Sequence, residues 1–217
     1  MISNNLKLRS ITSFFLITLI ILIFKYKFIL IYSLIVFGVI SFLEFSNLIN
    51  KVKLSTINRL ISNTLFLFYV FLFCFLFFLF CSFIQLKILL FIILLGCVAS
   101  DIGGFVFGKI LNGPKLTKIS PKKTYAGSLG SIILTCLTLS FLLYLISDTF
   151  SFKILLISTF TSIACQLGDL FFSFIKRKAN TKDTGNLLPG HGGLLDRLDG
   201  IFFGMPVGFL SLIIFYS

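Results

Sequence analysis

The residues best suited to chemistry lie in one polar segment, residues 173–199, of a chain that is otherwise almost continuously apolar. This segment holds five of the 19 Lys and Arg, three of the seven acids and the single histidine. Asp196 and Asp199 are three residues apart, so they share one face of a helix that starts after Gly193. We therefore expect any catalytic chemistry of this chain to involve this segment.

Two further acids, Asp101 and Asp169, fall near the ends of apolar stretches. A carboxylate within a bilayer is costly, so such residues usually face a water-filled cavity and carry a function. A structural hydrogen bond between helices is the alternative, and for Asp101 both readings stay open. Asp169 is followed at helical spacing by Ser173, Lys176 and Arg177, which places the four on one stripe. Acids among oxygen-bearing groups, without a Cys/His set, predict Mg²⁺ rather than zinc.

The glycines beside the single histidine suit a phosphate ligand. Gly192 and Gly193 lead into a charged helix start, where backbone can approach a ligand and N–H groups are free for phosphate. The alternative is a loop that needs glycine only for its turns. His191 could act as a base, but a phosphomonoester is largely dianionic near neutral pH because its second pKa is about 6. We therefore favour His191 as a positioning or phosphate-binding group.

A second polar loop, residues 109–125, carries five lysines together with Ser120 and Thr124. Lysines bind phosphate as point charges, so Lys122 and Lys123 are candidates for binding a polyanionic substrate. Taken alone, the loop is typical of a solvated segment that sets membrane topology. Together with the Asp and Gly elements, it is predicted to form the other half of a phosphate site.

Composition places these elements on an all-α, polytopic membrane scaffold. Of the 217 residues, 58% are hydrophobic and 12% charged, with a mean hydropathy of +1.10. Apolar runs of about 20 residues are long enough to cross a bilayer as helices. We predict about seven spans, the first retained rather than cleaved as a signal peptide, at 11–24, 28–43, 64–85, 88–108, 126–147, 154–173 and 200–216.

The distribution of basic residues predicts the orientation. With the predicted spans, 15 of the 19 Lys and Arg fall on the side of the N-terminus. By the positive-inside rule that side is cytoplasmic, so the loops 109–125 and 174–199 face the cytoplasm together. We divide the chain into an N-terminal membrane hairpin and surface loop, residues 1–63, and a membrane-embedded catalytic domain, residues 64–217. The loop 44–63 mixes apolar and basic residues at roughly helical spacing, so it is expected to lie on the membrane surface, and we assign it no chemistry.

The polar segment resembles the phosphatidate cytidylyltransferase (CDP-diacylglycerol synthase) family. The matching residues are Ser173, Lys176-Arg177, Lys182-Asp183, Gly185, Pro189, His191-Gly192-Gly193 and Asp196-Arg197-x-Asp199. Further elements follow in family order: Ser100-Asp101, Ser120-Pro121-x-Lys123-Thr124 and Gly168-Asp169-Leu170. The resemblance covers the chain from about residue 99 onward. One departure is Ala126, where many relatives carry a polar side chain.

The resemblance implies an enzyme that transfers CMP from CTP to phosphatidate and releases pyrophosphate, in phospholipid biosynthesis. It implies Mg²⁺, with a second, monovalent cation as an option, and metal ligands at Asp169 and Asp196. The implied catalytic residues are Asp169, Asp196, Lys182, Asp183 and His191. The implied substrate-binding residues are Asp101, Ser120, Lys122, Lys123, Thr124, Ser173, Lys176, Arg177, Gly192, Gly193, Arg197 and Asp199. Members are often dimeric, so a homodimer is expected.

Two alternatives stay open at this point. One is a related CTP-using enzyme that acts on another lipid phosphate, because recognition of the lipid chains would be spread over apolar helices. The other is a non-enzymatic transporter with Asp101 and Asp169 on an ion path. We expect no nucleic-acid partner. Because we find no organelle signal, we expect the inner membrane of a bacterium, with the active site facing the cytoplasm.

Overall fold

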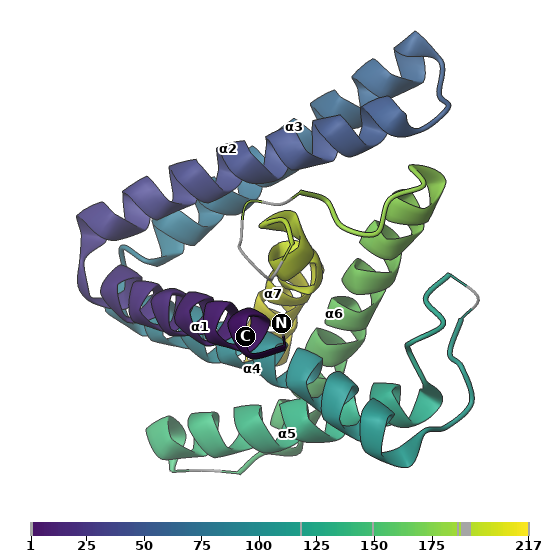
Figure 1. Ribbon diagram of the computed structural model, residues 1–217. Coiled ribbons are helices and arrows are strands. Elements are labelled where there is room, and N and C mark those ends of the chain that lie inside the picture. Colours follow the sequence, from purple (N-terminus) through teal and green to yellow (C-terminus); the bar gives the residue numbers. More distant parts are fainter. Residues whose placement is uncertain (1, 118, 149, 186, 188–191, 217) are drawn as a thin grey trace. The chain divides into compact units, whose positions relative to one another are not determined.

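The computed structural model describes residues 2–117, 119–148, 150–185, 187 and 192–216, and these form seven helices joined by turns and loops (Figure 1). The all-helical fold predicted from composition is therefore confirmed for the described residues. The helices are α1 (Ile2–Lys25), α2 (Lys27–Lys51), α3 (Thr56–Phe80), α4 (Ile84–Leu111), α5 (Tyr125–Ser147), α6 (Phe152–Lys178) and α7 (Leu195–Tyr216).

Six of these helices, α2 to α7, are long and apolar enough to cross a membrane. The apolar part of α1, Phe14–Lys25, is shorter. Each of the seven predicted spans lies largely within one of the helices. Among the described residues, however, six helices rather than about seven are long and apolar enough to cross a membrane. The chain is a multi-pass membrane protein.

The helices extend further than the apolar stretches that predicted them. α2 continues to Lys51 and α3 begins at Thr56, so most of the predicted surface loop 44–63 is helical. The roughly helical spacing of apolar and basic residues there agrees with this, because backbone hydrogen bonding continues past the end of an apolar run wherever no residue breaks the helix. The position of this segment on the membrane surface stays a prediction. This extension keeps Glu44 within α2.

Defined caps set the ends of the lysine-rich loop between α4 and α5. α4 ends at Leu111 and is followed by the C-cap Asn112, whose φ of 42° is the left-handed conformation typical of helix C-termini. Thr124 is the N-cap of α5, and its Oγ1 accepts a hydrogen bond from the Gly127 N–H at 3.1 Å. The predicted substrate-binding residue Thr124 therefore has a structural role in starting α5.

Packing divides the chain into two compact units, each described here by itself. Unit 1 consists of Met1–Leu79 and Ile175–Arg197, and unit 2 of Phe80–Phe174 and Leu198–Ser217. The helices α6 and α7 contribute residues to both units. The division predicted from the sequence, between residues 63 and 64, separates parts of the chain by their expected function and not by their packing. It stays a prediction.

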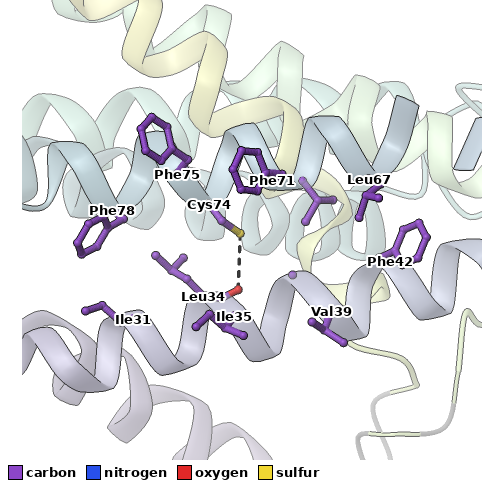
Figure 2. Close-up of a pocket in the computed structure, with 12 residues that line it drawn as sticks. Ile31, Leu34, Ile35, Val39, Phe42, Leu67, Phe71, Cys74, Phe75 and Phe78 are labelled. Carbon is purple, nitrogen blue, oxygen red and sulfur yellow. Dashed lines mark hydrogen bonds between the residues drawn. The ribbon is translucent and has the colours of Figure 1, made fainter. Parts of the chain in front are cut away.

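In unit 1, α2 and α3 pack along apolar faces and leave a groove between them (Figure 2). The groove has a volume of about 360 Å³, and its walls include Ile35 on α2 and Phe71 and Phe78 on α3. Its Cys74 thiol donates a hydrogen bond to the Leu34 carbonyl at 3.6 Å. None of the residues that line the groove belongs to the predicted site, so the chemistry of unit 1 lies elsewhere.

In unit 2, small residues bring α4 and α5 into close contact. A Cβ added to Gly103 would lie 2.5 Å from the Gly130 carbonyl oxygen, and one added to Gly104 would lie 2.8 Å from Ser131 Oγ. The same hydroxyl donates to the Ser100 carbonyl at 2.8 Å. Glycines and serines of this kind allow membrane helices to approach closely and to hydrogen-bond. The glycines that follow Asp101 therefore serve the packing of α4 against α5.

Candidate functional site

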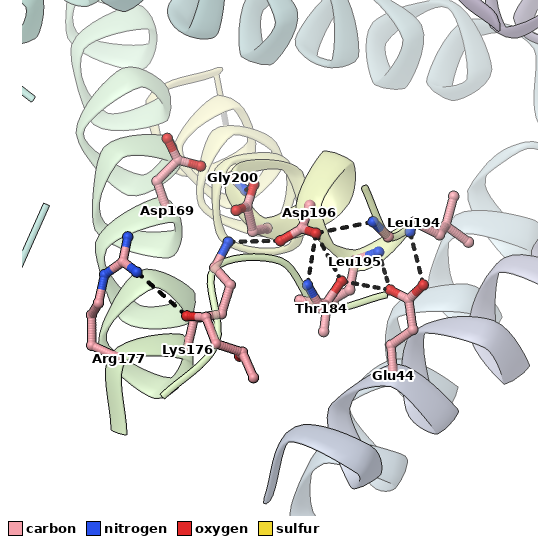
Figure 3. Close-up of polar contacts among 12 residues, drawn as sticks. Glu44, Asp169, Lys176, Arg177, Thr184, Leu194, Leu195, Asp196 and Gly200 are labelled. Atoms are coloured by element: carbon pink, nitrogen blue, oxygen red, sulfur yellow. Dashed lines mark hydrogen bonds and ion pairs between the residues drawn. The ribbon is translucent and has the colours of Figure 1, made fainter. Parts of the chain in front are cut away.

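In unit 1, Asp196 is the centre of a hydrogen-bonded cluster at the start of α7 (Figure 3). Its Oδ1 accepts from Lys176 Nζ at 2.7 Å. Its Oδ2 accepts from the Thr184 N–H at 2.8 Å and the Gly193 N–H at 3.0 Å, and lies 3.0 Å from Thr184 Oγ1. Both carboxylate oxygens are therefore held by protein donors.

The Lys176–Asp196 ion pair is largely enclosed. The side chains are 12% and 10% exposed, so water screens their attraction less than it would on an open surface. Lys176 lies in the last turn of α6, where a cation is also favoured by the helix dipole. The pair fixes the end of α6 against the start of α7.

A second carboxylate, Glu44 on α2, belongs to the same cluster. It accepts hydrogen bonds from the N–H groups of Leu194 and Leu195 and from the Thr184 hydroxyl. The sequence predicted that N–H groups next to Gly192 and Gly193 are free for phosphate. In the structure the amides of residues 193–195 donate to Asp196 and Glu44 instead, which corrects that prediction.

In unit 2, Lys123 pairs with Asp169. Lys123 Nζ lies 2.8 Å from Asp169 Oδ2, and the two side chains are 27% and 25% exposed. The loop that carries Lys123 is folded back on itself, because the Leu116 N–H donates to the Lys123 carbonyl at 2.7 Å and Lys123 N–H to the Ser120 carbonyl at 3.0 Å. This turn presents the lysine from the loop to α6.

The two membrane acids, Asp101 and Asp169, border the same backbone position in unit 2. A Cβ added to Gly200 would lie 3.2 Å from Asp169 Oδ1, 3.3 Å from the Cys165 carbonyl oxygen and 3.6 Å from Asp101 Oδ1. Two carboxylates and a carbonyl are hard oxygen donors of the kind that Mg²⁺ takes. The Lys123 ammonium already places one positive charge beside the Asp169 carboxylate.

These oxygen donors fit Mg²⁺ only if the substrate supplies part of the coordination shell of the ion. In the part of the chain that the structure describes, no three His, Cys, Asp or Glu side chains form a group that could hold a metal ion. Mg²⁺ is commonly held by one or two carboxylates with substrate phosphates and water completing its shell. Asp169 and Asp196 lie in different units, so their sharing of one ion stays a prediction.

The remaining predicted residues divide between the same two units. Unit 1 contains Arg177, Lys182, Asp183, Gly192, Gly193 and Arg197, and unit 2 contains Ser120, Lys122, Ser173 and Asp199. Lys182 and Asp183 are exposed on the loop before α7, whereas Asp199 is buried and its Oδ1 accepts from the Gly200 N–H at 2.9 Å. His191 lies outside the described residues. The functional roles assigned to these residues stay predictions.

Comparison with known proteins decides the family. The model of the cytidylyltransferase family matches residues 3–215. The chain belongs to the cytidylyltransferase family. This match covers both units, including α1, α2 and α3, which precede the part of the chain from about residue 99 that carries the resemblance.

Several curated relatives of this chain are bacterial phosphatidate cytidylyltransferases. A phosphatidate cytidylyltransferase of Rickettsia bellii (strain RML369-C) is 45% identical over 117 residues, which cover 50% of this chain and 51% of the relative. Those of Helicobacter pylori (strain ATCC 700392 / 26695) and Bacillus subtilis (strain 168) are each 42% identical, over 54% of this chain and 44% of the relative. The chain spans about half the length of the curated relatives it matches.

Sequence reasoning missed Glu44 and Thr184. Glu44 is the chain's single glutamate and one of seven acids, and it lies at the end of an apolar run. The cost of a carboxylate in a membrane, which drew attention to Asp101 and Asp169, applies to Glu44 as well. Glu44 could therefore have been selected as a candidate from the sequence on the same ground. Thr184 carries no comparable signal, because its contacts depend on the fold.

Proposed function

We propose that this chain is a phosphatidate cytidylyltransferase, which converts CTP and phosphatidate to CDP-diacylglycerol and pyrophosphate. The observation that carries the proposal is the identity of 42–45% to relatives that bear this name, within a family whose model matches residues 3–215. The clustering of the predicted Asp and Lys residues supports it, since a transporter would need no such cluster beside a glycine-rich loop.

The reaction exchanges one phosphorus–oxygen bond for another. An oxygen of the phosphatidate phosphate forms a bond to the α-phosphorus of CTP, and the bond from that phosphorus to the β-phosphate oxygen breaks, so that pyrophosphate leaves. The attacking phosphate is already largely dianionic near pH 7, because its second pKa is about 6. The protein's task is therefore mainly to position two polyanions and to offset their charge.

The two Asp–Lys pairs are suited to that task. We propose that Lys123 and Lys176, which now pair with Asp169 and Asp196, contact phosphate oxygens when substrates bind. The proposed ligands of Mg²⁺ are Asp196 and Asp169, the latter bordering Gly200 together with Asp101 and the Cys165 carbonyl. When bound, Mg²⁺ would neutralise charge on the phosphates and stabilise the entering and leaving oxygens. The exposed Lys182 and Arg177 add positive charge for the triphosphate.

We further propose that the protein lies in a bacterial inner membrane, with the loops 109–125 and 174–199 on the cytoplasmic side. The excess of Lys and Arg on that side of the predicted spans supports this orientation, and CTP is a soluble, charged substrate. The bacterial origin of the curated relatives supports the choice of membrane.

The test is product formation by the purified chain in lipid vesicles. With radiolabelled CTP, phosphatidate and Mg²⁺, we expect labelled CDP-diacylglycerol and an equal amount of pyrophosphate. EDTA should abolish the reaction and added Mg²⁺ should restore it. Parallel reactions with a polyprenol phosphate and an isoprenoid-glycerol phosphate compare the lipid substrates. If one of these two lipids gives product and phosphatidate gives none, that lipid replaces phosphatidate as the proposed substrate. If a folded sample gives no product with any of the three lipids, the assignment as an enzyme is refuted.

A further inference from the structure

Glu44 is buried in unit 1 at a position with no assigned role. It lies within α2, and 7% of its surface is exposed. Its contacts are to residues far away in sequence, in the loop before α7 and at the first turn of α7 (Figure 3). A buried carboxylate is retained at such a position only where specific donors satisfy it.

The donors are the backbone N–H groups at the start of α7. Leu194 N–H donates to Glu44 Oε1 at 3.0 Å, and Leu195 N–H donates to Oε2 at 2.8 Å. The first N–H groups of a helix have no partner within the helix, and the helix dipole favours negative charge there. Glu44 therefore acts as a cap for α7, supplied by another helix.

The glycines of the loop leave space for the Glu44 carboxylate. A Cβ added to Gly185 would lie 2.7 Å from Glu44 Oε1, and the three atoms nearest to it all belong to the Glu44 side chain. One added to Gly193 would meet Thr184 Oγ1 first and would lie 2.6 Å from Glu44 Oε2. The absence of a side chain is thus matched to Glu44 at Gly185, and to Thr184 and Glu44 together at Gly193.

Glu44 is connected to Asp196 through Thr184. Thr184 Oγ1 lies 2.8 Å from Glu44 Oε2 and 3.0 Å from Asp196 Oδ2, and its single hydrogen is available to one of them at a time. The Thr184 N–H holds Asp196 Oδ2 at 2.8 Å. Displacement of Glu44 would release Thr184 and the first turn of α7, and both of these fix the position of Asp196.

We propose that Glu44 is a positioning residue for the cytidylyl-transfer reaction: it holds the start of α7 so that Asp196 stays in its working position. This inference rests on the proposed function for its consequence in catalysis. The anchoring of α7 by Glu44 is a structural statement that can be tested without any turnover.

Hydrogen exchange of the full chain in lipid nanodiscs tests the anchor. In Glu44→Gln, one carboxylate oxygen becomes an NH₂ group that cannot accept a bond from an N–H. We expect exchange in the peptide that contains Leu194 and Leu195 to be about 10- to 100-fold faster than in the wild type, the loss expected for a hydrogen bond to a charged group. The matched control is Asp148→Asn, which removes an exposed carboxylate elsewhere. Unchanged exchange in Glu44→Gln would overturn the proposal.

Gly185→Ala is a second route to the same displacement, useful if Glu44→Gln does not fold. Its methyl group would occupy the space of Glu44 Oε1, so we expect the same faster exchange at the start of α7. In the double variant Glu44→Ala/Gly185→Ala the overlap is gone, and the second substitution should add nothing to the effect of the first. Additive effects of the two substitutions would show that Glu44 and Gly185 act independently, against the proposal.

The kinetic constants separate positioning from a purely structural role. We expect kcat/KM for CTP to fall about 100-fold in Glu44→Gln, as for a small misplacement of a reacting group, with an altered KM for CTP. A purely structural role would lower kcat only in proportion to the folded fraction and leave the KM unchanged, so a fall in kcat no larger than the loss of folded protein, with an unchanged KM, would overturn the proposal. A wild-type chain inactive with every lipid phosphate would refute the proposed function, while the exchange experiment would still decide whether Glu44 anchors α7.

Discussion

Replacing Asp196 with asparagine tests the cluster at the start of α7 most directly. An asparagine side chain has one accepting oxygen where aspartate has two. If its oxygen takes the place of Oδ2, the N–H bonds from Thr184 and Gly193 remain, and the NH₂ group faces the Lys176 ammonium. The opposite orientation would lose the bonds from both N–H groups. We therefore expect the first orientation, with the ion pair to Lys176 lost.

The structure gives the size of the effect. A hydrogen bond to a charged group contributes about 1.5–3 kcal/mol, and the value is expected to hold here because the two side chains are 12% and 10% exposed. The ammonium of Lys176 is also left without its carboxylate. We expect Asp196→Asn to lower the free energy of unfolding by about 2–3 kcal/mol. Turnover should fall at least about 100-fold, since Asp196 is also a proposed metal ligand.

Two measurements and a second variant check this prediction. Unfolding in mixed detergent micelles, followed by circular dichroism, gives the stability, and labelled CTP gives the turnover. In the double variant Asp196→Asn/Lys176→Met the ammonium that has lost Asp196 is removed as well, so we expect part of the stability to return while turnover stays lost. A stability within about 0.5 kcal/mol of the wild type would refute the reasoning about the ion pair. Near-normal turnover of Asp196→Asn would refute its place in the active site.

Three further predictions concern unit 2. Lys123→Met should lower the free energy of unfolding by less than about 1 kcal/mol, because the side chains of Lys123 and Asp169 are about a quarter exposed. Asp169→Asn should abolish turnover while leaving the amount of protein in the membrane unchanged. Retained activity of Asp169→Asn would contradict the proposed role of Asp169. Gly130→Ala should lower the free energy of unfolding by about 1–3 kcal/mol, because the added methyl group would overlap Phe107 on the facing helix. Gly38→Ala is its control, since the nearest atoms there are 3.4 Å away, and equal losses in both variants would contradict the packing argument.

The positions of the helices could be predicted from the sequence, but their ends could not. An apolar run identifies the part of a helix that can cross hydrocarbon. α2 and α3 continue into the mixed sequence of residues 44–51 and 56–63, where no proline or glycine interrupts the backbone. The end of a helix depends on caps such as Asn112, whose left-handed conformation is not specified by hydropathy.

The candidate site could be predicted only as far as local spacing reaches. The types and spacing of Asp169, Lys176 and Asp196 identified them as candidates before their contacts were known. The pairs Lys176–Asp196 and Lys123–Asp169 join residues that are 20 and 46 positions apart in sequence. Helical periodicity gives no information about contacts at such separations. Glu44 is 140 residues from Thr184, and its role depends entirely on the fold.

That separation has a consequence for the synthesis of the protein. Glu44 is made about 150 residues before the N–H groups that it binds at the start of α7. At about 5–20 residues per second, the ribosome needs about 8–30 s to reach them. During that interval α2 carries a carboxylate without its final donors, next to a membrane that disfavours it. Until α7 is made, that carboxylate has to be solvated by water or lipid headgroups, so Glu44 can reach its buried position only after the last helix has been synthesised.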